Sequence, residues 1–157
     1  MDTCCFTGHR NLPGEAIPAL QRRLEAEILA QISRGCRRFA AGGALGFDML
    51  AGLTVLKLKK SLPELLLVLV LPCRDQTKRW SRVEAASYEY IRTQADEEII
   101  LSESYYPGCM HKRNRYLVDH SDVCIAYLSQ PSGGTAYTVD YARRKGMPVI
   151  NLAKTTV

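Results

Sequence analysis

The sequence lacks the spacings that mark common metal and cofactor sites. Six cysteines stand at positions 4, 5, 36, 73, 109 and 124, without a C-x-x-C pair or a histidine at zinc-binding spacing. This argues against a zinc cage and a disulfide scaffold, and it favours reduced thiols in a cytosol. Neither a G-x-x-x-x-G-K-[ST] string nor a G-x-G-x-x-G string occurs. ATPase chemistry of the P-loop type and hydride transfer therefore lack support, and we expect no metal and no required cofactor.

Long apolar runs are also missing. The longest run, residues 65–71, is far shorter than the roughly 20 residues that a membrane span needs. A strand-like segment begins within three residues of the first methionine, which leaves no room for a signal peptide. We therefore expect a cytoplasmic protein without a membrane partner.

The charge balance is moderately basic, with 21 Lys and Arg against 16 Asp and Glu and a net charge of +5. Such an excess favours anionic partners, and a phosphate-bearing small molecule would satisfy it. A nucleic-acid partner is the weaker expectation, because no dedicated nucleic-acid-binding module is visible. A length of 157 residues suits one domain with one core.

Short apolar segments alternate with amphipathic segments along the chain. Strands are predicted at residues 3–7, 38–41, 65–71, 98–101, 122–127 and 148–151. Helices are predicted at residues 18–33, 49–61, 76–95, 110–120 and 136–145. This alternation predicts a single α/β domain over residues 1–157, with a three-layer Rossmann-like fold. A mostly parallel sheet of about six strands would then carry helices on both faces.

Glycine-rich segments follow three of the predicted strands, at residues 7–10, 42–48 and 132–135. In a parallel sheet the ligand crevice lies outside the carboxyl ends of the strands. Glycine lets the backbone approach an anion, and the N–H groups at the next helix start can donate to phosphate. A tight turn explains each loop alone, but the three together predict a phosphate site. The predicted ligand-binding residues are Thr7, Gly8, His9, Arg10, Gly42, Gly43, Ala44, Gly46, Asp48, Pro72, Cys73, Gln76, Trp80, Arg113, Asn114, Ser132, Gly133, Gly134 and Thr135.

Three side chains near the first two loops have both a functional and an ordinary interpretation. Arg10 could clamp a phosphate with two hydrogen bonds. His9 either faces the crevice or is a loop histidine with a backbone partner. Asp48 either accepts a ribose hydroxyl or stands in the first helical turn because the helix dipole favours a carboxylate there.

Later residues leave the same choice open. Arg113 and Asn114 belong to a helix that is rich in basic residues, and a solvated basic face is the ordinary interpretation of that pattern. Trp80 could form an aromatic wall for a base, although a core or interface position is favoured because large aromatic residues are mostly buried.

Taken in order, several strings resemble the YpsA-like branch of the SLOG superfamily over nearly the whole chain. They are C-C-F-T-G-H-R at 4–10, G-G-A-L-G-F-D at 42–48, L-P-C-R-D-Q-T-K-R-W at 71–80, R-N-R-Y-L-V-D at 113–119 and S-G-G-T at 132–135. The superfamily includes the Lonely Guy phosphoribohydrolases and DNA-processing protein A. The resemblance implies a nucleotide, an ADP-ribose-like derivative or a nucleoside monophosphate, held between the loops after the second and fifth strands. It also implies a homodimer.

The resemblance bears on catalysis as well. Lonely Guy enzymes carry P-G-G-x-G-T-x-x-E, whose glutamate acts with an arginine of the preceding helix in cleaving an N-glycosidic bond. Arg113 matches that arginine and Gly134-Thr135 match the final Gly-Thr, but Thr138 stands at the glutamate position. Threonine is neither a charged group nor a base near neutral pH. Asp140 lies about 200° further around the helix and would point away from the loop.

We therefore expect a ligand-binding sensor or carrier module without this cleavage. An N-glycosidase that uses Asp48, Arg113 or His9 is one alternative. Single-stranded DNA binding is another, suggested by the positive charge and by the relation to DNA-processing protein A.

Overall fold

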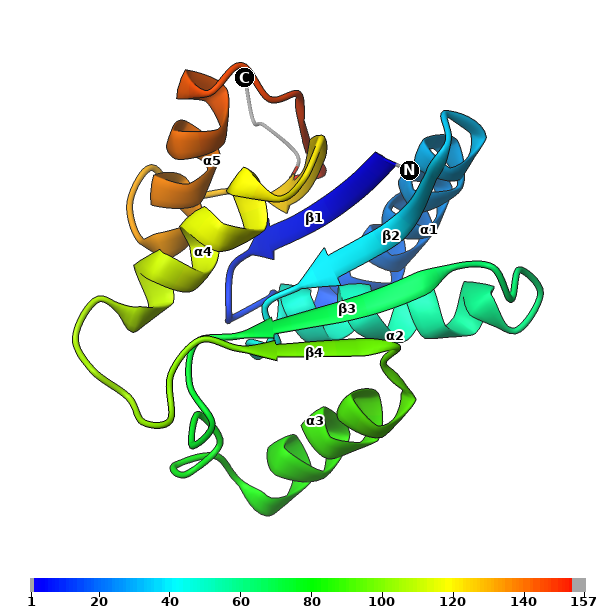
Figure 1. Cartoon of the computed structure of the whole chain (residues 1–157). Helices are drawn as coiled ribbons and strands as arrows, with labels where there is room; N and C mark the ends of the chain where they lie inside the picture. Colours follow the sequence, from blue (N-terminus) through cyan, green and yellow to red (C-terminus); the bar gives the residue numbers. More distant parts are fainter. Residues whose placement is uncertain (1, 154–157) are drawn as a thin grey trace.

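The computed structural model describes residues 2–153 as one parallel sheet between two layers of helices (Figure 1). This confirms the expected α/β fold. The strands are β1 (Asp2–Gly8), β2 (Cys36–Ala41), β3 (Leu66–Leu71), β4 (Glu97–Ile100), β5 (Val123–Tyr127) and β6 (Val149–Asn151). The helices are α1 (Ile17–Ser33), α2 (Phe47–Lys59), α3 (Arg82–Gln94), α4 (Cys109–Asp119) and α5 (Gly134–Arg144), with a short 3₁₀ turn at Gly14–Ala16.

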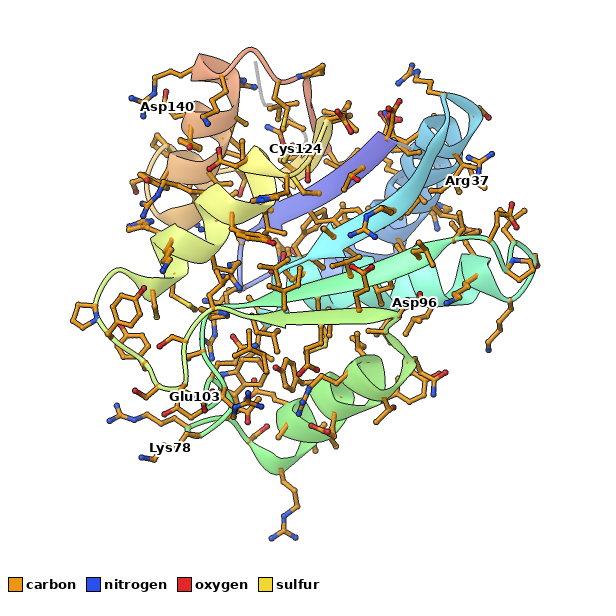
Figure 2. All side chains as sticks on the ribbon, viewed as in Figure 1. Arg37, Lys78, Asp96, Glu103, Cys124 and Asp140 are labelled. Atoms are coloured by element: carbon orange, nitrogen blue, oxygen red, sulfur yellow. The ribbon has the colours of Figure 1, made fainter. Side chains whose placement is uncertain are left out.

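The strand order β4-β3-β2-β1-β5-β6 places the first strand inside the sheet. The chain builds outward from β1 to β4, then crosses back through α4 and adds β5 and β6 on the other side of β1. All neighbouring strands are parallel, so their carboxyl ends meet at one edge. Figure 2 shows Lys78 and Glu103 at this edge, around the loops that follow β3 and β4, while Asp140 lies on α5.

Alternate residues of the strands pack into two separate hydrophobic cores, one on each face of the sheet. In β1, Cys4 and Phe6 pack on the face that α1, α2 and α3 cover, whereas Cys5 packs on the face that α4 and α5 cover. Side chains of successive strand residues point to opposite faces, which accounts for this division. Residues 67–71 of β3 are all buried, as their unbroken apolar sequence predicts for an inner parallel strand.

The predicted element boundaries agree with the structure to within two residues, with one exception. Residues 76–81 do not belong to the helix predicted over 76–95, because α3 begins at Arg82. Ser81 accepts a hydrogen bond from the Glu84 amide (3.1 Å), and the Glu84 carboxylate accepts one from the Ser81 amide (2.9 Å). This capping box fixes the helix start. The preceding residues 74–79 form turns at the carboxyl edge of the sheet.

The cysteines are all buried, and within residues 2–153 none forms a disulfide. The same part of the chain brings together no group of three or more His, Cys, Asp or Glu side chains suited to a metal ion. Across those residues, every helix is too short or too polar to span a bilayer.

Shortening Leu69, which is 1% exposed in β3, tests the inner position of this strand. We expect Leu69→Ala to lower the free energy of unfolding by about 2–5 kcal/mol, because it leaves a cavity between the sheet and its helices. Leu53→Ala, at a 40% exposed position of α2, is the control and should change it by less than about 1 kcal/mol. Urea denaturation measures both, and equal losses would contradict the assignment of β3 to the core.

Candidate functional site

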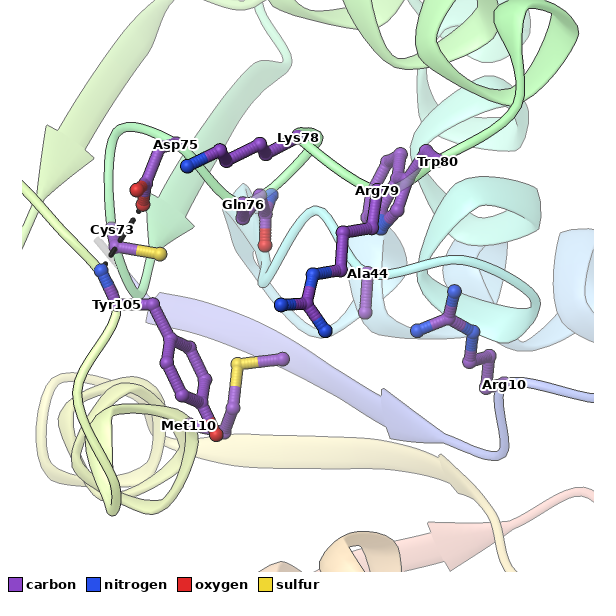
Figure 3. A pocket seen from close by; sticks show the side chains of 10 residues that line it. All are labelled: Arg10, Ala44, Cys73, Asp75, Gln76, Lys78, Arg79, Trp80, Tyr105 and Met110. Atoms are coloured by element: carbon purple, nitrogen blue, oxygen red, sulfur yellow. Dashed lines mark hydrogen bonds between the residues drawn. The ribbon is translucent and has the colours of Figure 1, made fainter.

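A cavity of about 480 Å³ opens at the carboxyl edge of the sheet (Figure 3). Its walls come from the loops after β1, β2, β3 and β4 and from the start of α4. The lining residues are Arg10, Ala44, Cys73, Asp75, Gln76, Lys78, Arg79, Trp80, Tyr105 and Met110. The size is that of a small-molecule site.

Three cations border this cavity. Arg10, Lys78 and Arg79 are exposed, and within the described part of the chain their side chains form no ion pair or hydrogen bond. Figure 3 shows the guanidinium groups of Arg10 and Arg79 approaching one another from different loops. Like charges that converge without a carboxylate between them create a positive potential, which favours an anionic ligand.

Aromatic and thioether side chains form the apolar part of the wall. Trp80 packs edge-to-face against Tyr88, with ring centroids 5.3 Å apart, and the Arg10 guanidinium carbon lies 6.0 Å from the Trp80 ring centroid. Tyr105 is 63% exposed and Met110 is 37% exposed at the other end of the cavity. Such side chains can cover the face of a planar group such as a nucleobase.

The glycine loop between β2 and α2 turns its amides inward. The Ala44 N–H donates to Oδ2 of Asp48 (3.3 Å), and the Phe47 N–H donates to the carbonyl oxygen of His9 (3.2 Å). Burial raises the pKa of Asp48 to about 6, although the charge of Arg113 and the amides of Ala44 and Gly42 act in the opposite direction. The amide of Ala44, which was expected to donate to phosphate, is therefore engaged by the protein's own carboxylate.

Arg113 is 4% exposed, so the ordinary interpretation of this helix as a solvated basic face does not hold for this residue, and Arg113 also does not line the cavity, where it was predicted to bind the ligand. Its guanidinium donates to the carbonyl oxygen of Gly42 and, from Nε, to Oδ1 of Asn114 (2.8 Å). Burial lowers the pKa of Arg113, and the neighbouring Asp48 carboxylate raises it. A Cβ atom at position 42 would lie 2.5 Å from the nearest guanidinium nitrogen, which explains the glycine there.

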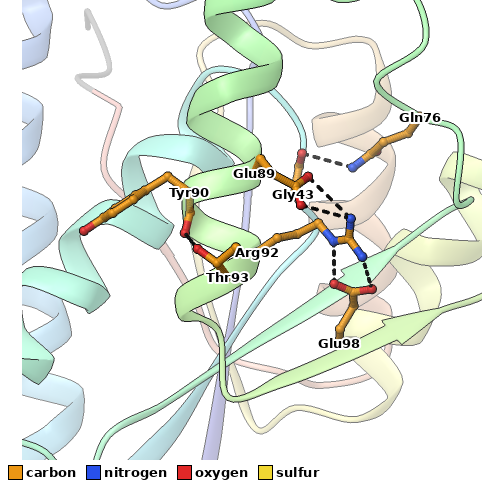
Figure 4. Close-up of polar contacts among 7 residues, drawn as sticks. All are labelled: Gly43, Gln76, Glu89, Tyr90, Arg92, Thr93 and Glu98. Atoms are coloured by element: carbon orange, nitrogen blue, oxygen red, sulfur yellow. Dashed lines mark hydrogen bonds and ion pairs between the residues drawn. The ribbon is translucent and has the colours of Figure 1, made fainter.

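Gln76 connects the loop after β3 to this glycine loop. Its Nε2 donates to the carbonyl oxygen of Gly43 (3.2 Å; Figure 4). Arg92 of α3 pairs with Glu98 of β4 (2.6 Å), so the helix that follows the loop is held to the edge strand. These contacts fix the position of the segment that carries Lys78 and Arg79.

His9 has the backbone partner that one interpretation of the sequence predicted. Its Nε2 accepts a hydrogen bond from the Ser129 amide (2.9 Å), which requires a neutral ring with an unprotonated Nε2. Burial lowers the pKa of His9, in accord with that state. The bond joins the loops after β1 and β5, the two strands between which the strand order reverses.

The model of the YspA SLOG family matches residues 5–149. The chain belongs to this family. It is similar to the SPbeta prophage-derived protein YoqJ of Bacillus subtilis, with 33% identity over 119 residues that cover 68% of this chain and 70% of YoqJ.

Two solved structures show that the fold is shared more widely. DNA processing protein A of Streptococcus pneumoniae superposes with a TM-score of 0.68 at 15% identity, over 94% of this chain and 49% of its own. DNA processing protein A of Helicobacter pylori, which binds single-stranded DNA, superposes with a TM-score of 0.64 at 18% identity, over 94% of this chain and 63% of its own. This family member thus spans about half to two thirds of those proteins.

The Ser132–Thr135 segment of this family member lies outside the cavity wall. Thr138, which stands where the Lonely Guy motif has glutamate, is 1% exposed and donates its hydroxyl to the carbonyl oxygen of Gly134 (2.8 Å). Asp140 is exposed and pairs with Arg144 (2.7 Å), so it points away from the loop as expected.

The structure brings only some of the predicted residues into the cavity wall. Those that line it are Arg10, Ala44, Cys73, Gln76 and Trp80. Those that do not are Thr7, Gly8, His9, Gly42, Gly43, Gly46, Asp48, Pro72, Arg113, Asn114, Ser132, Gly133, Gly134 and Thr135. The cavity therefore does not lie between the loops after the second and fifth strands.

Sequence reasoning missed Asp75, Lys78, Arg79, Tyr105 and Met110. Lys78 and Arg79 stand between Gln76 and Trp80, which were predicted for the site, but they were left out although residues 74–79 form turns before α3 begins at Arg82. The sequence feature that could have identified Lys78 and Arg79 is their position shortly after β3, the most apolar strand. Tyr105 and Met110 offered no local signal, because the fold alone brings them to the cavity.

Gly46 tests the close contact between the loops after β1 and β2. Its φ is +80°, and a Cβ atom there would lie 2.1 Å from the Arg10 carbonyl oxygen. We expect Gly46→Ala to lower the free energy of unfolding by at least about 2 kcal/mol. Gly14→Ala, where no atom lies within 4 Å of the added Cβ, is the matched control. Thermal unfolding measures both, and a neutral Gly46→Ala would refute the contact.

Asp48 should make stability depend on pH. The pKa of Asp48 is about 6 in the folded protein, so its carboxyl group stays protonated up to about pH 6, whereas the same group in the unfolded chain loses its proton near its ordinary pKa of 3.8. The stabilisation is thus present below about pH 4 and is lost as the pH rises through 6. We expect the wild type to lose roughly 2 kcal/mol relative to Asp48→Asn between pH 4 and 7. Urea titrations across that range measure the difference, and a difference that is independent of pH would contradict the buried titration.

Proposed function

We propose that this protein binds a nucleotide or nucleotide-derived ligand in the cavity at the carboxyl edge of the sheet, as a sensor or carrier module. The observation that carries the proposal is the approach of the Arg10 and Arg79 guanidinium groups beside an aromatic wall, with Lys78 lining the same cavity; among residues 2–153 none of the three forms an ion pair. Neither feature alone indicates this ligand class, but together they match a phosphate joined to a planar base.

The two arginines suit the phosphate. A guanidinium donates two parallel hydrogen bonds to phosphate oxygens, and Arg10 and Arg79 approach from different loops, so they can hold one group from two sides. Trp80 lies beside these guanidinium groups, and Tyr105 lies at the other end. The phosphate would then be bound by side chains, while the glycine loop shapes the cavity wall through Ala44.

Binding without N-glycosidic cleavage remains our proposal. The Lonely Guy motif places its catalytic glutamate at the position of Thr138, whose hydroxyl donates to the Gly134 carbonyl oxygen and which does not line the cavity. Asp48 is buried against the glycine loop and His9 is bound to the Ser129 amide, so neither lines the cavity.

Trp80 is the sole tryptophan in the sequence, so its fluorescence reports on the cavity. We expect AMP, ADP, ADP-ribose or NAD to change the emission at submillimolar concentration, and adenosine to bind more weakly than AMP. Arg10→Gln and Arg79→Gln should each weaken nucleotide binding about tenfold or more, because each removes hydrogen bonds to a charged group. Calorimetry confirms the affinities independently of the tryptophan signal.

The matched control is Arg34→Gln. Arg34 is exposed at the end of α1, next to the amino end of β2 and therefore at the opposite edge of the sheet. The Arg34→Gln substitution removes the same charge as the cavity variants and should leave the nucleotide affinity unchanged. An absence of binding at millimolar nucleotide would refute the proposal. Salt-dependent binding of a single-stranded oligonucleotide without nucleotide binding would replace it by the DNA-binding alternative.

A further inference from the structure

Asp75 is a carboxylate in the wall of a cavity that is otherwise cationic. It lines the same space as Arg10, Lys78 and Arg79. Figure 3 shows the Lys78 side chain extending toward Asp75, although none of the ion pairs of residues 2–153 joins Asp75 to these cations. A carboxylate near an anionic ligand lowers affinity unless it accepts hydrogen bonds from the ligand. A ligand that carries hydrogen-bond donors on its uncharged part would make this carboxylate favourable for binding.

The backbone holds this carboxylate in place. Oδ1 of Asp75 accepts a hydrogen bond from the Tyr105 amide (3.1 Å), drawn as a dashed line in Figure 3. The same two loops are joined next to it by the Arg74 amide, which donates to the Ser102 carbonyl oxygen (3.0 Å), and by the Arg74–Glu103 ion pair (3.0 Å). The orientation of Asp75 is therefore set by two anchored loops.

Acceptor capacity remains on the carboxylate after these contacts. An ionised carboxylate accepts at about four lone-pair positions, and the Tyr105 amide uses one. The buried Cys73 thiol is a weak donor beside it; burial and the adjacent Asp75 carboxylate raise the pKa of Cys73 to about 11, so the thiol stays protonated. Neither contact neutralises the carboxylate charge.

The sequence suggested a different residue, Asp48, for the role of hydrogen-bond acceptor. The predicted acceptor for a ribose hydroxyl was Asp48, which is 7% exposed, accepts from the Ala44 amide and does not line the cavity. In Figure 3 Asp75 lies with Cys73 and Tyr105, on the side of the cavity away from Arg10. An anion held between the arginines would thus leave the uncharged part of the ligand toward Asp75.

We propose that Asp75 is a specificity-determining residue that accepts hydrogen bonds from O–H or N–H donors on the uncharged part of the ligand. This inference rests on the proposed function, because it assumes that the phosphate occupies the arginine side. Sugar hydroxyls and an exocyclic base amine supply the same chemistry, and analogues that lack one or the other separate them.

The test compares AMP with 2′,3′-dideoxyadenosine 5′-monophosphate, which lacks the sugar hydroxyls, and with purine riboside 5′-monophosphate, which lacks the base amine. Trp80 fluorescence and calorimetry measure the affinities. The wild type should prefer AMP over at least one analogue by about tenfold or more, as expected for hydrogen bonds to a charged acceptor.

Asp75→Asn keeps an amide oxygen for the Tyr105 N–H and removes the charge. It should bind AMP and the discriminated analogue within about twofold of one another, since the lost contact is the source of the preference. Asp140→Asn is the matched control, because it makes the same change at an exposed position of α5 outside the cavity wall and should keep the preference. Far-ultraviolet circular dichroism verifies that both variants are folded.

Each result has one meaning. A preference that is lost in Asp75→Asn supports the inference, and the discriminated analogue identifies the sugar or the base as the donor. Equal wild-type affinities for all three nucleotides overturn the inference and leave the proposed function standing, whether or not the variant folds. A preference that persists in folded Asp75→Asn also overturns it. An absence of AMP binding overturns both.

Discussion

The buried guanidinium of Arg113 joins the segments on which the cavity depends. It links α4 to the Gly42 carbonyl at the end of β2, and its charge faces Asp48 of α2. The neighbouring Gly43 carbonyl receives Gln76 from the loop after β3. Replacing the Arg113 or Gln76 side chain should lower stability, because it would leave a charge or a carbonyl group without a partner in a low-dielectric interior. These contacts hold Ala44 in the cavity wall, while the amides of Ala44 and Phe47 donate to other groups of the protein.

Some basic side chains form ion pairs that connect strands and helices, whereas those at the cavity do not. Some basic side chains elsewhere in the described residues pair across elements, as Arg38 does with Glu97 and Arg92 with Glu98. These pairs hold the edge strand β4 to β2 and α3. Among residues 2–153, Arg10, Lys78 and Arg79 around the cavity form no ion pair, and Asp75 is oriented by a backbone amide. The structure thus shows where part of the positive charge lies, which the composition alone does not show.

Fold and site differ in how far the sequence predicts them. The parallel sheet follows from local patterns, since apolar strands and amphipathic helices alternate and glycine punctuates them. Arg10 and Trp80 were predicted for the site because they stand in loops that a parallel sheet gathers at one edge. Asp48 and Arg113 share those loops or face them, yet both are buried. Local sequence does not show whether a polar side chain at a loop points toward solvent or toward another polar side chain.

The sequence by itself determined the layers, the parallel strands and the edge at which the loops gather, because hydrophobic periodicity and turn residues act over short distances along the chain. Only the tertiary structure decided that Asp48 and Arg113 interact in the interior while Asp75, Lys78 and Arg79 border a cavity with Tyr105 and Met110. Those neighbours come from different loops and helices, and their proximity follows from the crossing order of the strands and from the start of α3 at Arg82. Contacts between segments far apart in the chain depend on that packing, which no short window of sequence contains.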